Sequence, residues 1–217
     1  MIPDETEAIL AAYHRWYYAT NVWDQTTFLG VLCMKAVTDL WSYQEIISQL
    51  APSIIVEFGT YIGGSALYFA TIATNVNARA RVLTVDHKTA RIHESVKRHP
   101  AIEILEFCTT DPAVGSRISK MRLENPGPLF AILDSDHRKS HVVAELKSLR
   151  FVTSRGDYVV VEDTNMNGHP IITDFGDGPM EAVAAYESEF PYDYRHDKGR
   201  ETKFGLTFAP RGYLIRQ

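Results

Sequence analysis

The sequence of 217 residues predicts an α/β fold built on a mostly parallel, doubly wound sheet. Segments typical of strands and of helices alternate from residue 53 onward, which is the order of βαβ units. A glycine-rich turn at residues 59–65 separates the first apolar strand from a helix. The last segments have the pattern of an antiparallel C-terminal hairpin, and residues 1–50 have a helical pattern rich in aromatic side chains.

Each element is expected where an apolar run or a capping signal supports it. The strands are short apolar runs rich in β-branched residues, which suit a buried parallel sheet. Asp111 followed by Pro112 is a strong helix opening, because the aspartate caps the first turn and proline fits the first helical position. The expected strands are residues 53–58, 81–85, 102–107, 129–133, 157–161, 192–195 and 207–215; the expected helices start near Ser65, Ala90, Pro112 and Lys139 and cover residues 180–189.

Composition and charge restrict the setting of the protein. A formal net charge of −5 disfavours binding to nucleic acid or to an anionic membrane surface, so we expect a small-molecule partner. Cys33 and Cys108 have apolar neighbours, which indicates buried thiols in a reducing compartment. The chain has no apolar run of about 18 residues. Acids at Asp4, Glu5 and Glu7 disfavour a signal peptide, and we expect a cytoplasmic protein.

The glycine-rich turn is the strongest sign of a ligand site. Glu57 stands at the carboxyl end of the preceding strand, where a carboxylate can meet a cationic or hydroxyl-bearing ligand. Gly59, Gly63 and Gly64 let the backbone turn sharply and allow a ligand to approach closely. The spacing G-x-x-x-G-G-S differs from the dinucleotide pattern G-x-G-x-x-G, which disfavours a nicotinamide cofactor. The alternative is a tight turn that binds nothing.

Polar residues also follow the next two strands. Asp86 ends the second strand, where its carboxylate can accept hydrogen bonds from both hydroxyls of a ribose; the alternative is a helix cap. Thr110 or Asp111, after the third strand, can contact the edge of an adenine, although capping is the stronger explanation for Asp111. With the glycine-rich turn, these residues predict a site for a nucleotide-like ligand.

Two acidic clusters end the fourth and fifth strands. Asp134, Asp136 and His137 lie in L-D-S-D-H, and Glu162 and Asp163 lie in V-E-D-T. Since the carboxyl ends of neighbouring parallel strands meet at one edge, the four carboxylates would repel one another unless a cation lay among them. Oxygen ligands in this number suit Mg²⁺. The alternative is that Asp134 and Glu162 only cap helices.

Three of these motifs together resemble those of a known family. E-F-G-T-Y-I-G-G-S, L-D-S-D-H and V-V-E-D-T are similar to motifs of the cephalosporin hydroxylase and rhamnosyl O-methyltransferase family. The resemblance extends upstream through residues 28–47 and downstream to P-R-G-Y-L at residues 210–214, so it covers nearly the whole chain. It implies a Rossmann-like class I methyltransferase fold with S-adenosylmethionine as cofactor and an acidic Mg²⁺ site. We expect one domain over residues 1–217, with a helical extension at 1–50 and the core at 51–217.

The resemblance also implies roles for individual residues. Glu162 and Asp163 would bind the metal; Asp134 or Asp136 would be the third ligand, and Asp136 could instead be the base. Asp136 or His137 would accept the proton of the acceptor hydroxyl. The residues expected to bind the cofactor are Glu57, Gly59, Thr60, Gly63, Gly64, Ser65 and Asp86, with Thr110, Asp111 and Asp134 beside them.

The function expected from these residues is Mg²⁺-assisted O-methyl transfer to a hydroxyl of a sugar or of a secondary-metabolite, antibiotic-like molecule. The acceptor and the methylated position stay open. A metal-dependent hydroxylase is one alternative, although the 2-His-1-carboxylate set of Fe(II) oxygenases is not apparent; a non-catalytic cofactor-binding protein is another. The aromatic extension is expected to pack against the core or a partner subunit of a homo-oligomer, with a substrate lid as the alternative.

Overall fold

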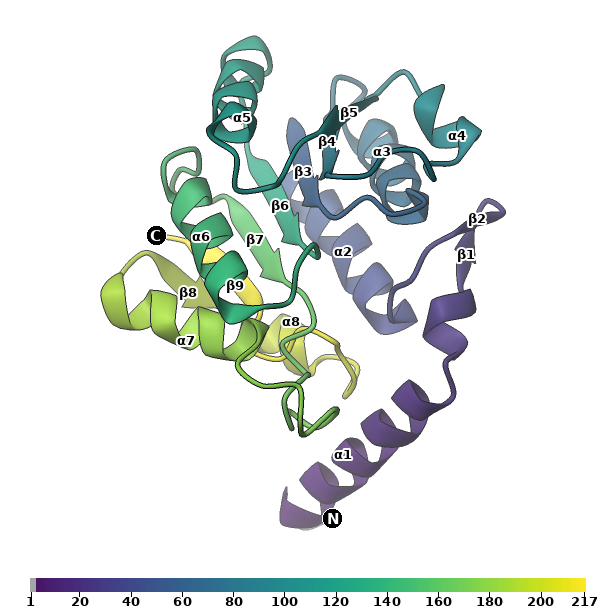
Figure 1. The fold of residues 1–217 in the computed structure, drawn as a ribbon, viewed down its shortest axis with the longest axis vertical. Coiled ribbons are helices and arrows are strands. Elements are labelled where there is room, and N and C mark those ends of the chain that lie inside the picture. The colour runs from purple at the N-terminus through teal and green to yellow at the C-terminus, as the bar shows by residue number, and fades with distance from the viewer. Residues whose placement is uncertain (1–2) are drawn as a thin grey trace.

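A seven-stranded sheet organises the chain in the computed structural model, which describes residues 3–217 (Figure 1). Residues 1–2 of the expected helical extension lie outside the described residues. The strand order is β5-β4-β3-β6-β7-β9-β8, in which β9 is antiparallel to both β7 and β8 and the other neighbours are parallel. The strands are β3 (Ile54–Phe58), β4 (Arg81–Asp86), β5 (Ile102–Glu106), β6 (Leu129–Leu133), β7 (Tyr158–Val161), β8 (Tyr194–His196) and β9 (Tyr213–Arg216).

The chain reverses its direction of travel across the sheet between β3 and β6. From β3 it adds β4 and then β5 on one side, and it returns to add β6 and then β7 on the other. Such a switch point leaves a crevice at the carboxyl ends of the two central strands, where open α/β sheets bind ligands.

Helices cover both faces of this sheet (Figure 1). The apolar residues of α2 and α3 pack on one face, and those of α5, α6 and α7 pack on the other. The bounds are α1 (Pro3–Ala19), η1 (Val22–Gln25), α2 (Val37–Leu50), α3 (Gly64–Val76), α4 (Glu94–Lys97), α5 (Pro112–Glu124), α6 (Lys139–Arg150), α7 (Pro179–Glu189) and α8 (Lys198–Thr202), and a two-stranded hairpin is formed by β1 (Thr27–Phe28) and β2 (Val31–Leu32).

The alternation of side chains along β3 divides the core between the two faces. Ile54 and Val56 pack with the α5, α6 and α7 side, whereas Ile55 packs with the α2 and α3 side. Because successive strand residues point to opposite faces, Glu57 points to the same face as Ile55. A carboxylate is therefore buried beneath α2 and α3, at the end of a fully buried strand.

The expected α/β class, the mostly parallel sheet and the antiparallel C-terminal strands are confirmed. The helix expected from near Ala90 is only the short α4, and the β1–β2 hairpin and α8 were not expected. The last strand begins at Tyr213 instead of near Thr207, because the carboxylate of Asp39 on α2 accepts hydrogen bonds from the Thr207 hydroxyl and the Phe208 amide. These bonds tie residues 207–208 to α2 before the chain reaches the sheet.

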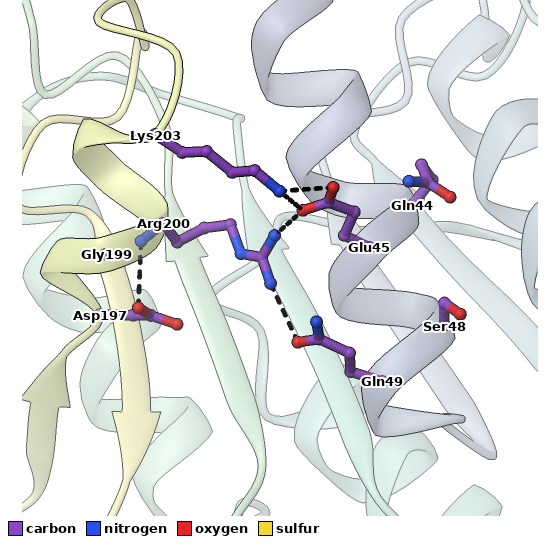
Figure 2. Close-up of a pocket in the computed structure, with 8 residues that line it drawn as sticks. All are labelled: Gln44, Glu45, Ser48, Gln49, Asp197, Gly199, Arg200 and Lys203. Carbon is purple, nitrogen blue, oxygen red and sulfur yellow. Dashed lines mark hydrogen bonds and ion pairs between the residues drawn. The ribbon is translucent and has the colours of Figure 1, made fainter.

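The N-terminal extension is attached to the core through aromatic and ionic contacts. α1 extends away from the sheet at the lower edge of Figure 1, and its Tyr17 ring packs against Phe208. Figure 2 shows the small polar pocket where α8 meets α2: Lys203 Nζ lies 2.6 Å from Glu45 Oε1, and Arg200 binds both Glu45 and Gln49.

No helix within residues 3–217 is long and apolar enough to cross a membrane.

The glycine-rich turn confirms the sharp change of direction expected of it. Gly59 and Gly63 have φ values of +97° and +92°, a region that favours glycine. The close approach that we expected of a ligand is made here by the protein itself. A Cβ at Gly59 would lie 1.9 Å from the carbonyl oxygen of Asp134, and one at Gly64 would lie 2.0 Å from that of Leu32.

We therefore expect Gly64→Ala to destabilise the fold by about 1–3 kcal/mol or more, because the new methyl group would push β2 away from α3. Gly115→Ala is the matched control, since a Cβ there would meet nothing closer than the Ser148 hydroxyl at 3.7 Å. The control should be neutral or stabilising by up to about 1 kcal/mol, as expected for alanine in a helix. Urea unfolding of both variants measures the difference; equal free energies of unfolding would contradict the close packing at Gly64.

Candidate active site

The carboxyl ends of the parallel strands open into a cavity of about 780 Å³. Its wall takes residues from the loops after β3, β4, β5, β6 and β7, and others from the N-terminal extension. The expected site residues that line it are Gly59, Thr60, Gly63, Gly64, Ser65, Asp86, Asp134, Asp136, His137, Glu162 and Asp163.

Asp86 holds the glycine-rich turn in place. Its Oδ2 accepts hydrogen bonds from the backbone amides of Thr60 at 3.0 Å and Tyr61 at 2.9 Å, and its Oδ1 accepts one from Lys88 at 3.0 Å. A carboxylate oxygen has two lone pairs, so Oδ2 is fully used by the two turn amides, whereas Oδ1 can still accept a hydroxyl hydrogen bond from a ligand. The alternative reading of Asp86 as a helix cap is wrong, because the next helix, α4, is capped by His93.

Glu57 lies beneath the turn and outside the cavity wall. Its Oε2 accepts a hydrogen bond of 2.6 Å from the Thr84 hydroxyl, which is itself 2.6 Å from the Thr60 hydroxyl, whereas its buried Oε1 has no partner among the described residues. Burial raises the pKa of Glu57 to about 7, although the charge of Lys35 opposes the increase. The carboxylate therefore supports the turn from below at an energetic cost.

Asp134, His137 and Asp163 form the group best placed to hold a metal ion. One ligand atom of each lies within 4.8 Å of the others. Nδ1 of His137 is 3.4 Å from Oδ2 of Asp163, and Nε2 is 3.7 Å from Oδ1 of Asp134. Burial and the nearby Asp134 raise the pKa of Asp163 to about 7, which indicates too little positive charge around it. Two carboxylates facing a cavity that admits water and substrate fit the way proteins hold Mg²⁺.

Lys35, which follows β2, supplies part of the missing positive charge. Its ammonium forms an ion pair with Asp134 and lies 2.8 Å from Oε2 of Glu162, and its side chain is 2% exposed. Burial alone would lower the pKa of Lys35, but the attraction of Asp134, Glu162 and Glu57 raises it well above the usual value. The ammonium therefore stays charged and occupies part of the space that we expected a divalent cation to fill.

The other two expected ligands bind protein cations in this structure. Both oxygens of Glu162 are engaged, Oε2 by Lys35 and Oε1 by the Tyr43 hydroxyl at 2.9 Å. Asp136 binds Arg138, whose guanidinium lowers the pKa of that carboxyl to about 2. The alternative that Asp134 and Glu162 cap helices is wrong, since α6 and α7 begin after Arg138 and Gly178.

At the end of β5, the cavity is lined by different residues from those expected. Thr110 and Asp111 lie outside its wall, and Asp111 caps α5 by accepting a 2.8 Å hydrogen bond from the Ala113 amide, which confirms the capping explanation. Cys108 and Thr109 line the cavity instead. Cys33 is buried as expected, but Cys108 is exposed, so the expectation of a buried thiol there is wrong.

The N-terminal extension contributes cavity residues that were not among the expected site residues. Lys35 is the main one, and a lone lysine within V-L-C-M-K-A-V was the available signal for a buried cation with an acidic partner. Tyr18, Trp23 and Met34 also line the cavity. The expectation that the aromatic extension packs against the core is therefore confirmed for Tyr18 and Trp23, which in addition reach the cavity.

Comparison with known proteins gives consistent matches. Residues 20–217 match the family described as "Rhamnosyl O-methyltransferase/CmcI". A rhamnosyl O-methyltransferase of Mycobacterium bovis (strain BCG / Pasteur 1173P2) is 51% identical over 211 residues, which are 97% of this chain and 86% of that protein.

Solved structures show the same fold at low identity. The structure named "cmcI-D160 Mg-SAM" has a TM-score of 0.72 and 19% identity, and the match covers 89% of this chain and 77% of that one. An O-methyltransferase from Bacillus cereus in complex with SAH has a TM-score of 0.55 and 13% identity, with coverage of 100% and 93%. The fold is therefore the expected Rossmann-like class I methyltransferase fold.

The buried carboxyl of Glu57 makes a pH-dependent contribution to stability. Its pKa is about 7 in the folded protein, against about 4.3 in an unfolded chain, so the folded state binds an extra proton between these pH values. The free energy of unfolding of the wild type should consequently fall as the pH rises through this interval, by on the order of 3 kcal/mol from this group.

Glu57→Gln removes the ionisation. The variant's midpoint of thermal unfolding, relative to that of the wild type, should be higher at about pH 8 than at about pH 5. A difference that does not change with pH would show that Glu57 ionises at an ordinary pKa.

Proposed function

The chain belongs to the rhamnosyl O-methyltransferase/CmcI family, and we propose that it methylates a hydroxyl group of a sugar, with S-adenosylmethionine as the methyl donor. It is an O-methyltransferase, and a rhamnosyl residue is the first acceptor to test, because that is the sugar named for its 51% identical relatives. An acceptor on an antibiotic-like molecule is a further candidate of the same chemical kind.

One observation carries this proposal: a single cavity joins the glycine-rich turn and Asp86 to the acid cluster at the ends of β6 and β7. The sharply curved backbone of the turn suits the aminoacyl part of the methyl donor. The carboxylate of Asp86 suits the ribose part. The acid cluster offers groups that can orient a hydroxyl and accept its proton. Methyl transfer needs both, held within reach of each other, since the enzyme's main task is to align the acceptor oxygen with the methyl carbon.

The reaction itself is simple in atoms and charge. The acceptor oxygen attacks the methyl carbon, the bond from that carbon to the sulfonium sulfur breaks, and the products are the methyl ether, S-adenosylhomocysteine and a proton.

His137 is the better placed of the two candidate proton acceptors. It lines the cavity between Asp134 and Asp163, where an acceptor hydroxyl can reach its ring. Asp136 is a weak base by comparison, because Arg138 lowers its pKa to about 2.

We assign the metal site to Asp134 and Asp163. Oδ1 of Asp134 faces His137, away from the oxygen that binds Lys35, and Asp163 is 19% exposed. Mg²⁺ prefers oxygen to nitrogen ligands, which leaves the imidazole free for the proton. Bound there, Mg²⁺ would supply positive charge that lowers the pKa of the acceptor hydroxyl. Glu162 would support the site through Lys35.

Methyl transfer to a rhamnoside, measured with labelled S-adenosylmethionine, tests the function, and chelation tests the metal. EDTA should abolish turnover, while calorimetry should still detect binding of S-adenosylhomocysteine, whose expected contacts lie on the glycine-rich turn and Asp86. Asp163→Asn should lower kcat by on the order of a hundredfold or more, the size expected when charge stabilisation of the transition state is lost.

Asp174→Asn is the matched control, because Asp174 is exposed on the loop between β7 and α7 and lies outside the cavity wall. It should leave kcat unchanged. Full turnover in the presence of EDTA would contradict the metal assignment, and absence of methyl transfer to any glycoside would contradict the sugar acceptor.

A further inference from the structure

We propose that Tyr18, Trp23 and Phe208 form the acceptor subsite, an aromatic wall that binds the apolar face of a sugar ring and turns one of its hydroxyls toward Asp163 and His137. The inference rests on the proposed function and deepens it, since it assigns side chains to the recognition of the acceptor.

The three rings make one fixed cluster. Tyr18 and Trp23 are stacked, with centroids 5.0 Å apart and planes 20° from parallel. Phe208 meets Tyr18 and Trp23 edge to face, at 5.7 Å in each case. The Trp23 indole also donates a 3.0 Å hydrogen bond to the Tyr18 carbonyl oxygen, which fixes its orientation. The wall is therefore held in place before any ligand arrives.

The Phe208 part of the wall lies on the β7 and β9 side of the sheet, away from β4. The glycine-rich turn and Asp86 follow β3 and β4, the acid cluster follows β6 and β7, and β9, whose approach contains Phe208, is paired with β7. The amide of Asn165, just after β7, donates a hydrogen bond to the Phe208 carbonyl oxygen. The three rings therefore come from other elements than the glycine-rich turn and Asp86, which are the expected contacts of the donor. The rings are thus free for the second substrate.

The chemistry of the wall suits a sugar more than a flat polar ligand. Tyr18 and Trp23 are only half-buried, Phe208 is buried, and all three line the cavity. The electron-rich faces of aromatic rings attract the weakly positive C–H groups on the apolar side of a pyranose. Met34 and Met166 add adaptable apolar surface to the same cavity. The carboxylates and the imidazole of the acid cluster, which line the same cavity, then meet the hydroxyls.

This assignment gives part of the N-terminal extension a substrate-binding role. Tyr18 ends α1 and Trp23 lies in η1, so the extension brings its aromatic rings to a cavity formed by the core. Trp16, by contrast, is 61% exposed and lies outside the wall, as does Trp41. The expected homo-oligomer stays a prediction. Its interface would involve exposed aromatic residues such as Trp16 and Trp41, and not Tyr18 or Trp23.

The first test compares Trp23→Ala with Trp41→Ala, which removes an exposed tryptophan away from the cavity. With methyl rhamnoside as acceptor, Trp23→Ala should raise the acceptor KM by roughly tenfold to a hundredfold, the loss expected for an aromatic contact surface. The Kd of S-adenosylhomocysteine should stay within about threefold, and Trp41→Ala should change neither constant. An unchanged acceptor KM, or a lost affinity for S-adenosylhomocysteine, would overturn the subsite.

The second test needs no turnover and no disruptive variant. The chain has three tryptophans, so Trp16→Phe combined with Trp41→Phe leaves Trp23 as the only indole that fluoresces. Saturable addition of methyl rhamnoside should then change the intensity or position of the Trp23 emission. If this change occurs without methyl transfer, the proposed function fails and the subsite stands; if transfer occurs and the emission does not change, the subsite is overturned.

Discussion

The rest of the site depends on the interaction between the buried ammonium of Lys35 and the carboxylates of Asp134 and Glu162. The lysine comes from the N-terminal extension and binds carboxylates at the ends of β6 and β7, Asp134 through an ion pair and Glu162 at 2.8 Å. One side chain therefore joins the extension to the two strands that carry the acid cluster. Removing a partner from a buried pair typically costs about 3–5 kcal/mol, because the remaining charge is left uncompensated. With Lys35 in place, Asp134 can turn its other oxygen toward the cavity.

One lysine is not enough to neutralise the carboxylates around it. The pKa values of Glu57 and Asp163 are raised to about 7, in both cases chiefly by burial, so the site still favours added positive charge. The proposed ligands supply it, since both a sulfonium group and a divalent metal ion are cations. Ionised carboxylates without enough counter-charge destabilise the fold, but they strengthen the binding of cationic ligands. Such a loss of stability in exchange for binding is expected at a functional site.

The sequence predicted those parts of the structure whose signals are local. Five parallel strands were found because each is an apolar run followed by an acid or a turn, and Asp111 was identified as a cap from its neighbour Pro112. Lys35, the cation that binds the acid cluster, could not be predicted in this way. Lys35 and Asp134 are 99 residues apart, and the residues next to Lys35 in the sequence do not indicate which carboxylate it binds. The start of β9 was missed for a similar reason, since the bonds from Asp39 to Thr207 and Phe208 join distant segments. Local patterns thus predicted the strand ends, while the charges and rings that complete the cavity depend on tertiary contacts.

The ionisation of Lys35 in the folded protein is the measurement that bears most directly on this arrangement. Nitrogen-15 NMR of the lysine side chains, with Lys35→Met used to assign the Lys35 signal, follows each ammonium through a pH titration. The exposed lysines should titrate near their ordinary pKa of about 10.4. Lys35 should stay protonated beyond that point for as long as the protein remains folded, because the attraction of Asp134 and Glu162 outweighs burial. A Lys35 signal that titrates below the exposed lysines would show that burial dominates and would contradict a permanent ammonium at the centre of the site.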